Sequence, residues 1–191
     1  MNFAFSEEQD QLRDAVRKFC EAKSPETEVR RLMETTEGYD PAVWSQMANE
    51  LGLQSLHIPE EFGGQGFTFV ELGIVLEEMG RVLLCAPYFS SVVLAAGTIL
   101  NAGTDAQKGE LLPGIAAGEL AFCIGMSEPD SGSDLAATRT RAIRDGDVYR
   151  VTGTKVWTSF AHEADWVILF CRTGSGGPAA RVPGSGSTVA P

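Results

Sequence analysis

Few of the residue types that build metal and disulfide sites occur in this chain of 191 residues. It has two histidines, His57 and His162, and four cysteines, and no two cysteines form a CxxC pair. Isolated histidines and widely spaced cysteines favour neither a zinc site nor a disulfide framework. We therefore expect no metal site and a protein with reduced thiols.

Basic charge and long apolar runs are also scarce. The 15 Lys and Arg residues against 26 Asp and Glu residues give a net charge of −11, which argues against a nucleic-acid partner. No apolar run has the length of a membrane span, and the first residues, MNFAFSEEQD, lack the pattern of a signal peptide. Hydrophobic residues make up 43% of the chain, enough for a packed core. These features predict a cytoplasmic protein without a membrane span.

The first 120 residues carry the signals of helices. Ser6–Gln9 and Thr68–Glu71 have the spacing of a capping box, and each precedes a helical pattern of apolar residues. Asp40–Pro41 is typical of a helix start. Gly73 lies inside the helix that begins after Thr68, where glycine destabilises relative to alanine, so we expect a neighbouring backbone to approach it closely. Residues 1–120 are predicted to form an all-helical domain.

The pattern changes after residue 118. The runs LAFCI, VYRVTG and DWVILFCR predict strands, and DGD at 145–147 predicts a turn. Residues 174–191 contain mainly Gly, Ser, Pro and Ala, a linker-like composition. The fold class is therefore predicted as α+β: the N-terminal helical domain, an incomplete antiparallel β domain over 121–173, and a disordered tail over 174–191.

A polar loop, GMSEPDSGSD at 125–134, directly follows the first strand-like run. Backbone N–H groups in a loop rich in Gly and Ser can converge on an anion. Glu128, Asp130 and Asp134 would repel a phosphate, so we expect them to cap local N–H groups. Composition alone leaves two interpretations open, an ordinary turn and an anion-binding loop, and favours the turn.

Other residues that attract attention have ordinary structural interpretations. Glu77 and Glu78 are adjacent on a helix and point in different directions, so they predict a solvated face or a salt bridge rather than an acid–base pair. Trp157, taken alone, is interpreted as a core aromatic residue. Ser127 and Ser159 are interpreted as strand ends.

Three collinear stretches together resemble one family. They are GMSEPDSGSD with the following LAA (125–137), PEEFGGQGFTFVELGIVLEEMGR (59–81) and DGDVYRVTGTKVWTSFAHEADWVILFCRT (145–173). With the flanking helices, residues 1 to about 173 resemble the acyl-CoA dehydrogenases. The resemblance implies an N-terminal helical domain, a middle β domain and a C-terminal helical domain. It also implies FAD as cofactor and α,β-dehydrogenation of an acyl-CoA thioester in fatty acid or related acyl-CoA oxidation.

The resemblance also implies a set of site residues around the flavin and the nucleotide phosphates. They are Ile124, Met126 and Ser127 lining the flavin ring, Ser133 near the phosphates of FAD or of the CoA substrate, Trp157 packing on the flavin, and Ser159 near the ring nitrogen that accepts hydride. An indole shields a flavin face from water, and a hydroxyl can stabilise charge on the reduced ring. The sequence departs from the family at Phe160, where asparagine is common.

The family's catalytic base is a carboxylate that the resemblance places beyond the end of this chain, so no catalytic residue is assigned. We expect a truncated chain, with a frameshift near residue 173 as one hypothesis. The implied partners are an acyl-CoA, an electron-transfer flavoprotein as acceptor, and a homo- or hetero-oligomer or a complementing C-terminal chain. Two alternatives stay open: a non-catalytic module that binds flavin, acyl-CoA or a partner subunit, and an inactive frameshifted fragment.

Overall fold

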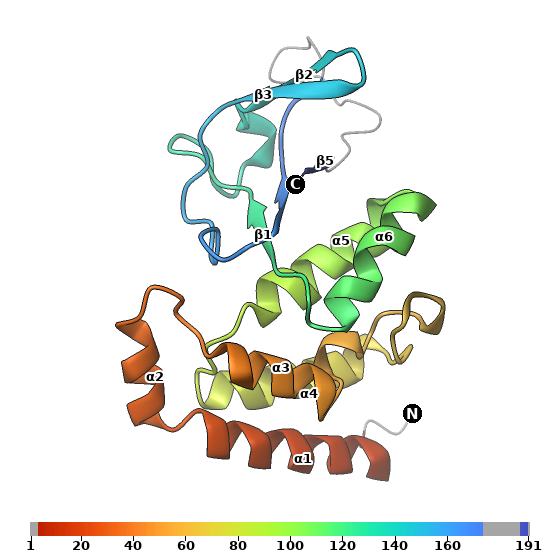
Figure 1. The fold of residues 1–191 in the computed structure, drawn as a ribbon, viewed down its shortest axis with the longest axis vertical. Coiled ribbons are helices and arrows are strands. Elements are labelled where there is room, and N and C mark those ends of the chain that lie inside the picture. The colour runs from red at the N-terminus through yellow and green to blue at the C-terminus, as the bar shows by residue number, and fades with distance from the viewer. Residues whose placement is uncertain (1–3, 174–187, 191) are drawn as a thin grey trace.

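Helices form one end of the molecule and strands the other (Figure 1). The computed structural model describes residues 4–173 and the short strand at 188–190. The helical elements are α1 (Glu7–Lys23), α2 (Glu26–Met33), α3 (Pro41–Asn49), α4 (Phe69–Arg81), the π-helix η3 (Phe89–Ala96) continuing into α5 (Gly97–Ala102), and α6 (Asp105–Ala116). Three 3₁₀ turns are η1 (Leu53–Ser55), η2 (Glu60–Phe62) and η4 (Leu135–Ala137). The predicted α+β class is confirmed.

The helix starts lie where the sequence predicts them. Ser6 Oγ accepts the N–H of Gln9 at 3.2 Å, and Gln9 Oε1 accepts the N–H of Ser6 at 3.0 Å, which completes the capping box of α1. The same reciprocal pair opens α4 at Thr68 and Glu71. Such caps pair N–H groups that the first helical turn leaves without an internal partner.

The described strands form two small sheets. They are β1 (Phe122–Gly125), β2 (Arg141–Asp145), β3 (Val148–Thr152), β4 (Trp166–Leu169) and β5 (Thr188–Ala190). β2 and β3 form an antiparallel hairpin around the predicted DGD turn. In the other sheet β4 pairs antiparallel with β5 but parallel with β1, so this part of the sheet departs from the expected antiparallel pairing. Parallel neighbours need a long crossover, and the loop, hairpin and turn between β1 and β4 supply it.

The tail predicted over 174–191 lies outside the described residues except for β5. Over the residues that the structure does describe, no helix combines the length and the apolar character needed to cross a membrane.

Strand β1 packs directly against the helical part of the molecule. The N–H of Phe122 donates to Ser91 Oγ of η3 at 2.9 Å, and the ring of Phe122 stacks on Trp166 of β4 with 6.4 Å between centroids. Trp44 of α3 donates its indole N–H to the carbonyl of Gly118 at 2.9 Å. These contacts fix the start of β1 relative to the helices.

A buried carboxylate joins α1 to α4. Glu78 is 1% exposed, and its carboxylate accepts hydrogen bonds from Arg13 at 3.0 Å and from Arg17 at 2.8 and 3.0 Å. Arg81 lies 3.4 Å from the same carboxylate. Glu77, its neighbour in sequence, is 61% exposed. Glu78 therefore forms a buried salt bridge, and Glu77 is a largely solvated residue that also pairs with Arg13 at 2.6 Å, which agrees with the predicted solvated face or salt bridge.

The close approach predicted at Gly73 is wrong. Gly73 is exposed, and a Cβ built on it would meet nothing within 4 Å. We expect Gly73→Ala to raise the free energy of unfolding by about 0.5–1 kcal/mol, because alanine is the better helix former and restricts the unfolded chain. Urea unfolding followed by far-ultraviolet circular dichroism measures this change. A destabilised variant would contradict the open surroundings of this position.

Candidate functional site

The polar loop that follows β1 lies against a second segment far along the chain. Beyond Gly125, the carbonyl of Ser127 accepts the N–H of Val156 at 3.0 Å. The ammonium of Lys155 donates to the carbonyl of Met126 at 2.9 Å. These bonds bring residues 126–128 and 155–157, two of the stretches that carried the resemblance, to one place.

Trp157 projects from this place into solvent. Its residue is 88% exposed and its backbone has φ of 55°, in the left-handed region that disfavours residues with a side chain. Met126, on the neighbouring segment, is 38% exposed. The interpretation of Trp157 as a core aromatic residue is therefore wrong. A large apolar ring held away from the core in a strained backbone conformation is typical of a binding site.

Glu128 is a buried residue of the loop and accepts three hydrogen bonds there. It is 5% exposed, and its carboxylate accepts the backbone N–H groups of Arg139 at 2.6 Å and Thr140 at 2.9 Å, together with Lys155 Nζ at 2.9 Å. Burial alone would raise the pKa of Glu128, yet these donors outweigh burial and lower the pKa to about 2. Glu128 accepts backbone N–H groups as expected, but the expectation that these are local is wrong, because they lie 11 and 12 residues further along the chain. Asp130 pairs with the Arg139 side chain at 2.9 Å.

The structure brings together some of the six residues expected to form the site. Met126 and Ser127 lie beside the segment that carries Trp157, and Ile124 lies in β1 opposite Ile168 of β4. Ser133 and Ser159 lie on exposed turns. In the part of the chain that the structure describes, no hydrogen bond holds either of these serines against Met126 or Ser127. Their roles stay predictions.

Lys155 is the residue of this site that the sequence does not reveal. In TGTKVW it is a single lysine in a polar stretch, a pattern typical of a solvated side chain, yet its side chain is only 10% exposed. Phe160, at the family's asparagine position, packs edge-on against Tyr39 of the helical domain, 6.0 Å between centroids. That contact fixes the end of the turn after Trp157 to the helices.

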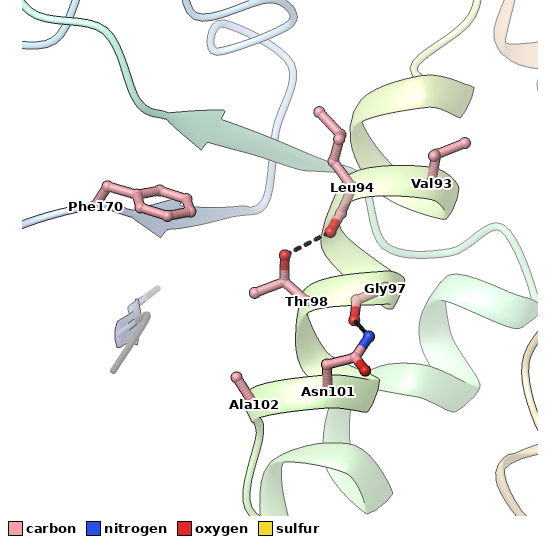
Figure 2. A pocket seen from close by; sticks show the side chains of 7 residues that line it. All are labelled: Val93, Leu94, Gly97, Thr98, Asn101, Ala102 and Phe170. Atoms are coloured by element: carbon pink, nitrogen blue, oxygen red, sulfur yellow. Dashed lines mark hydrogen bonds between the residues drawn. The ribbon is translucent and has the colours of Figure 1, made fainter. Parts of the chain in front are cut away.

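A pocket of about 470 Å³ opens between the helices and the sheet (Figure 2). Its lining residues are Val93, Leu94, Gly97, Thr98, Asn101, Ala102 and Phe170. Thr98 and Asn101 donate back to carbonyls of their own helix, those of Leu94 and Gly97, both at 2.7 Å. The lining has no titratable group and offers a mainly apolar surface. Over the described residues, no cluster of three or more His, Cys, Asp or Glu side chains is arranged to hold a metal ion.

Comparison with known proteins decides the family. The model of the acyl-CoA dehydrogenase N-terminal domain matches residues 6–119, more than half of the chain. The chain belongs to the acyl-CoA dehydrogenase family. The model of the acyl-CoA dehydrogenase middle domain matches residues 123–187, so the likeness continues beyond residue 173, where the resemblance was expected to end.

Similar acyl-CoA dehydrogenases include FadE26 of Mycobacterium tuberculosis, which is 39% identical over 181 residues, covering 91% of this chain and 44% of FadE26. Mitochondrial isovaleryl-CoA dehydrogenase of Bos taurus is 32% identical over 178 residues, covering 88% of this chain and 40% of that enzyme. The chain thus spans less than half the length of these relatives.

Solved structures of similar chains agree with the fold. The ChsE4–ChsE5 complex from Mycobacterium tuberculosis contains a chain that is 38% identical, with a TM-score of 0.80 over 93% of this chain and 46% of that one. A glutaryl-CoA dehydrogenase from Mycobacterium smegmatis, solved in complex with FADH2, is 28% identical with a TM-score of 0.79, covering 90% of this chain and 44% of that one.

Proposed function

We propose that this chain provides one part of the flavin site of an FAD-dependent acyl-CoA dehydrogenase, which removes two hydrogens from Cα and Cβ of an acyl-CoA thioester. The observation that carries the proposal is the juxtaposition of residues 126–128 with residues 155–157, and the exposed indole that this juxtaposition presents. Family membership and the FADH2 complex of a similar dehydrogenase support FAD as the ligand.

The residues of this place fit a flavin. The exposed parts of Met126 and Trp157 offer apolar surface to a planar ring, and Ser127 follows Met126 and bonds through its carbonyl to Val156, the neighbour of Trp157. In this proposal Met126 and Ser127 line the ring, Trp157 covers one face from water, and the hydroxyls of Ser127 and Ser159 donate to its polar edge. Bound FAD would supply the acceptor for the hydride that leaves the substrate. Ser133 is proposed to contact a phosphate of FAD or of CoA.

Two carboxylates of this loop, Glu128 and Asp130, are poorly suited to act as a base. Glu128 is engaged by Lys155 and by two backbone N–H groups, and its pKa of about 2 makes it a poor proton acceptor. Asp130 is solvent-exposed and paired with Arg139. We therefore propose that the general base for the α-proton comes from another segment or from a partner chain. This observation also favours the second candidate function, a module that binds flavin or acyl-CoA without turning it over.

Partners are proposed from the same comparisons. Two similar chains come from structures described as the ChsE4–ChsE5 complex and as a Tcur3481–Tcur3483 steroid ACAD. We propose that this chain likewise assembles with a second subunit, which can be a further copy or a different chain. We propose an electron-transfer flavoprotein as the electron acceptor.

Replacing Trp157 by alanine tests the flavin assignment. We expect the wild-type chain to bind FAD saturably in equilibrium dialysis, and Trp157→Ala to bind about fivefold more weakly, because ring stacking contributes about 1 kcal/mol. Trp157→Phe should retain most of the affinity. Phe89→Ala is the matched control, since Phe89 is also exposed, at 57%, but lies on the helical domain. Equal FAD binding by Trp157→Ala, or no saturable binding by the wild type, would contradict the proposal.

Reduction of bound flavin separates the two candidate functions. Acyl-CoAs of short, medium and steroid side-chain type are added anaerobically to the flavin-loaded chain, alone and with its partner subunit, and flavin absorbance is followed. Bleaching supports the dehydrogenase. Flavin that binds but is not bleached under either condition supports the non-catalytic module.

A further inference from the structure

Lys155 and Glu128 form a buried ion pair beneath the exposed site. Their side chains are 10% and 5% exposed, and Lys155 Nζ lies 2.9 Å from Glu128 Oε1. The two residues are 27 positions apart in the chain. Charged side chains are rarely buried unless they are paired, and a buried pair seldom adds much net stability over an apolar pair of the same size. The position of this pair beneath the site therefore suggests a role other than stabilising the fold.

The pair lies where strand pairing ends. β1 pairs with β4 up to Gly125, and within the described residues no strand pairs with 126–128, where Glu128 makes only an isolated bridge with Ser131. Three hydrogen bonds join residues 126–128 to residues 155–156: the backbone bond from Val156 to Ser127, and two bonds from Lys155 Nζ, to the Met126 carbonyl and to Glu128. Two of these three bonds thus pass through one ammonium group.

The lysine stem is also held. A Cβ added to Gly125 would lie 3.2 Å from Lys155 Cγ, so the stem runs tightly along the end of β1. The carboxylate that receives the ammonium is fixed as well, because it also accepts the N–H groups of Arg139 and Thr140. Neither partner can swing away without leaving buried polar groups unpaired, which is costly.

We propose that Lys155 is a positioning residue, which acts with Glu128 to fix Ser127 and Trp157 at a set separation across the loop. The assignment of flavin as the group held there rests on the proposed function, whereas the fixed separation rests on this geometry alone. Removing the ammonium leaves the single backbone bond between Val156 and Ser127 to hold the two segments together.

Amide hydrogen exchange, measured residue by residue, tests this role without flavin. We expect Lys155→Met to speed exchange at the Val156 N–H by about tenfold or more, while exchange at Ile168 in β4 stays unchanged. Lys155→Arg, which keeps a charged donor, should restore much of the slow exchange. Arg150→Met is the matched control, because Arg150 makes only an exposed pair with Asp145 on the hairpin.

The outcomes separate the proposal from general destabilisation and from failure of the flavin assignment. Unchanged exchange at Val156, or exchange that speeds equally at Ile168, overturns the positioning role. Glu128→Gln is a second test, since it removes the charge on the other partner, and it should speed amide exchange at Val156 in the same way.

FAD affinity is measured in parallel. If the wild type binds FAD, Lys155→Met should bind FAD about tenfold more weakly, and Lys155→Arg should bind it with nearly the wild-type affinity. A Lys155→Met variant that binds FAD as tightly as the wild type counts against the proposal. If the wild type does not bind FAD, the proposed function fails, and local loosening at Val156 still supports the positioning role.

Discussion

Replacing Glu78 by glutamine is expected to lower the free energy of unfolding by about 2–3 kcal/mol at pH 7. Glu78 is the buried acceptor at which Arg13 and Arg17 of α1 meet α4. Removing one partner of a buried charge pair is costly, because it leaves the remaining charges without compensation. This loss is smaller than is usual for a broken buried pair, because glutamine keeps the side-chain shape and Arg17 is 37% exposed and can be solvated.

The effect of this substitution should depend on pH in a defined direction. The arginine hydrogen bonds, led by Arg17, lower the pKa of Glu78 from its ordinary value of 4.5 to about 2. The unfolded chain therefore takes up this proton at a higher pH than the folded chain does, and the stabilisation is complete above about pH 5 and is lost as the pH falls towards 2. Between pH 5 and pH 3 the wild type should lose about 1–2 kcal/mol more stability than Glu78→Gln does.

Urea unfolding followed by circular dichroism at several pH values measures both expectations. Glu77→Gln is the matched control, because Glu77 is the adjacent helix position, pairs with the same Arg13 and is 61% exposed. Exposed pairs contribute little, so this variant should lie within about 0.5 kcal/mol of the wild type. Equal losses from the two substitutions, or a pH slope in Glu78→Gln as steep as in the wild type, would count against the buried role of Glu78.

Features that depend on near neighbours in the chain could be predicted from the sequence. The capping boxes of α1 and α4 and the turn between β2 and β3 are set by residues within a few positions of each other, and all lie where the pattern places them. The chemistry of such a cap does not depend on the rest of the fold. The interpretation of Glu77 and Glu78 holds in part for the same reason, since the helix exposes Glu77 and buries Glu78, although Arg13 reaches both carboxylates.

Features that depend on distant segments could not be predicted. The parallel pairing of β1 with β4 follows from the path of the intervening loop and hairpin, which no local pattern records. Lys155 is buried only because Glu128 and the Met126 carbonyl meet it there. Trp157 is exposed on a left-handed backbone, whereas hydrophobicity alone predicts burial. The resemblance placed Met126, Ser127 and Trp157 in one site without these physical reasons.

The stretch FGGQG, residues 62–66, is a further feature that depends on distant segments. The sequence does not show at which of its glycine positions the fold excludes a side chain. A Cβ on Gly64 would lie 1.8 Å from the carbonyl oxygen of the buried residue Ile58, with backbone rather than a flexible side chain in the way. Residues 64–67 also hydrogen-bond along residues 55–59, for example from the N–H of Gly66 to the Ile58 carbonyl at 2.9 Å. The two segments have to separate to admit even a methyl group.

We therefore expect Gly64→Ala to lower the free energy of unfolding by about 3 kcal/mol, at the upper end of the usual cost of overpacking. Gly73→Ala is its matched control, because the same added methyl group there meets open space and should stabilise the chain. Urea unfolding of both variants measures the change in the free energy of unfolding relative to the wild type. This change should be negative for Gly64→Ala and positive for Gly73→Ala, although both substitutions add the same methyl group. A Gly64→Ala variant whose unfolding free energy stays within about 0.5 kcal/mol of the wild type would show that residues 64–67 do not lie against Ile58 as closely as the structure has them. Such a result would also remove the reason for glycine at this position, since Gly64 does not have the positive φ that requires glycine at Gly63 and Gly66.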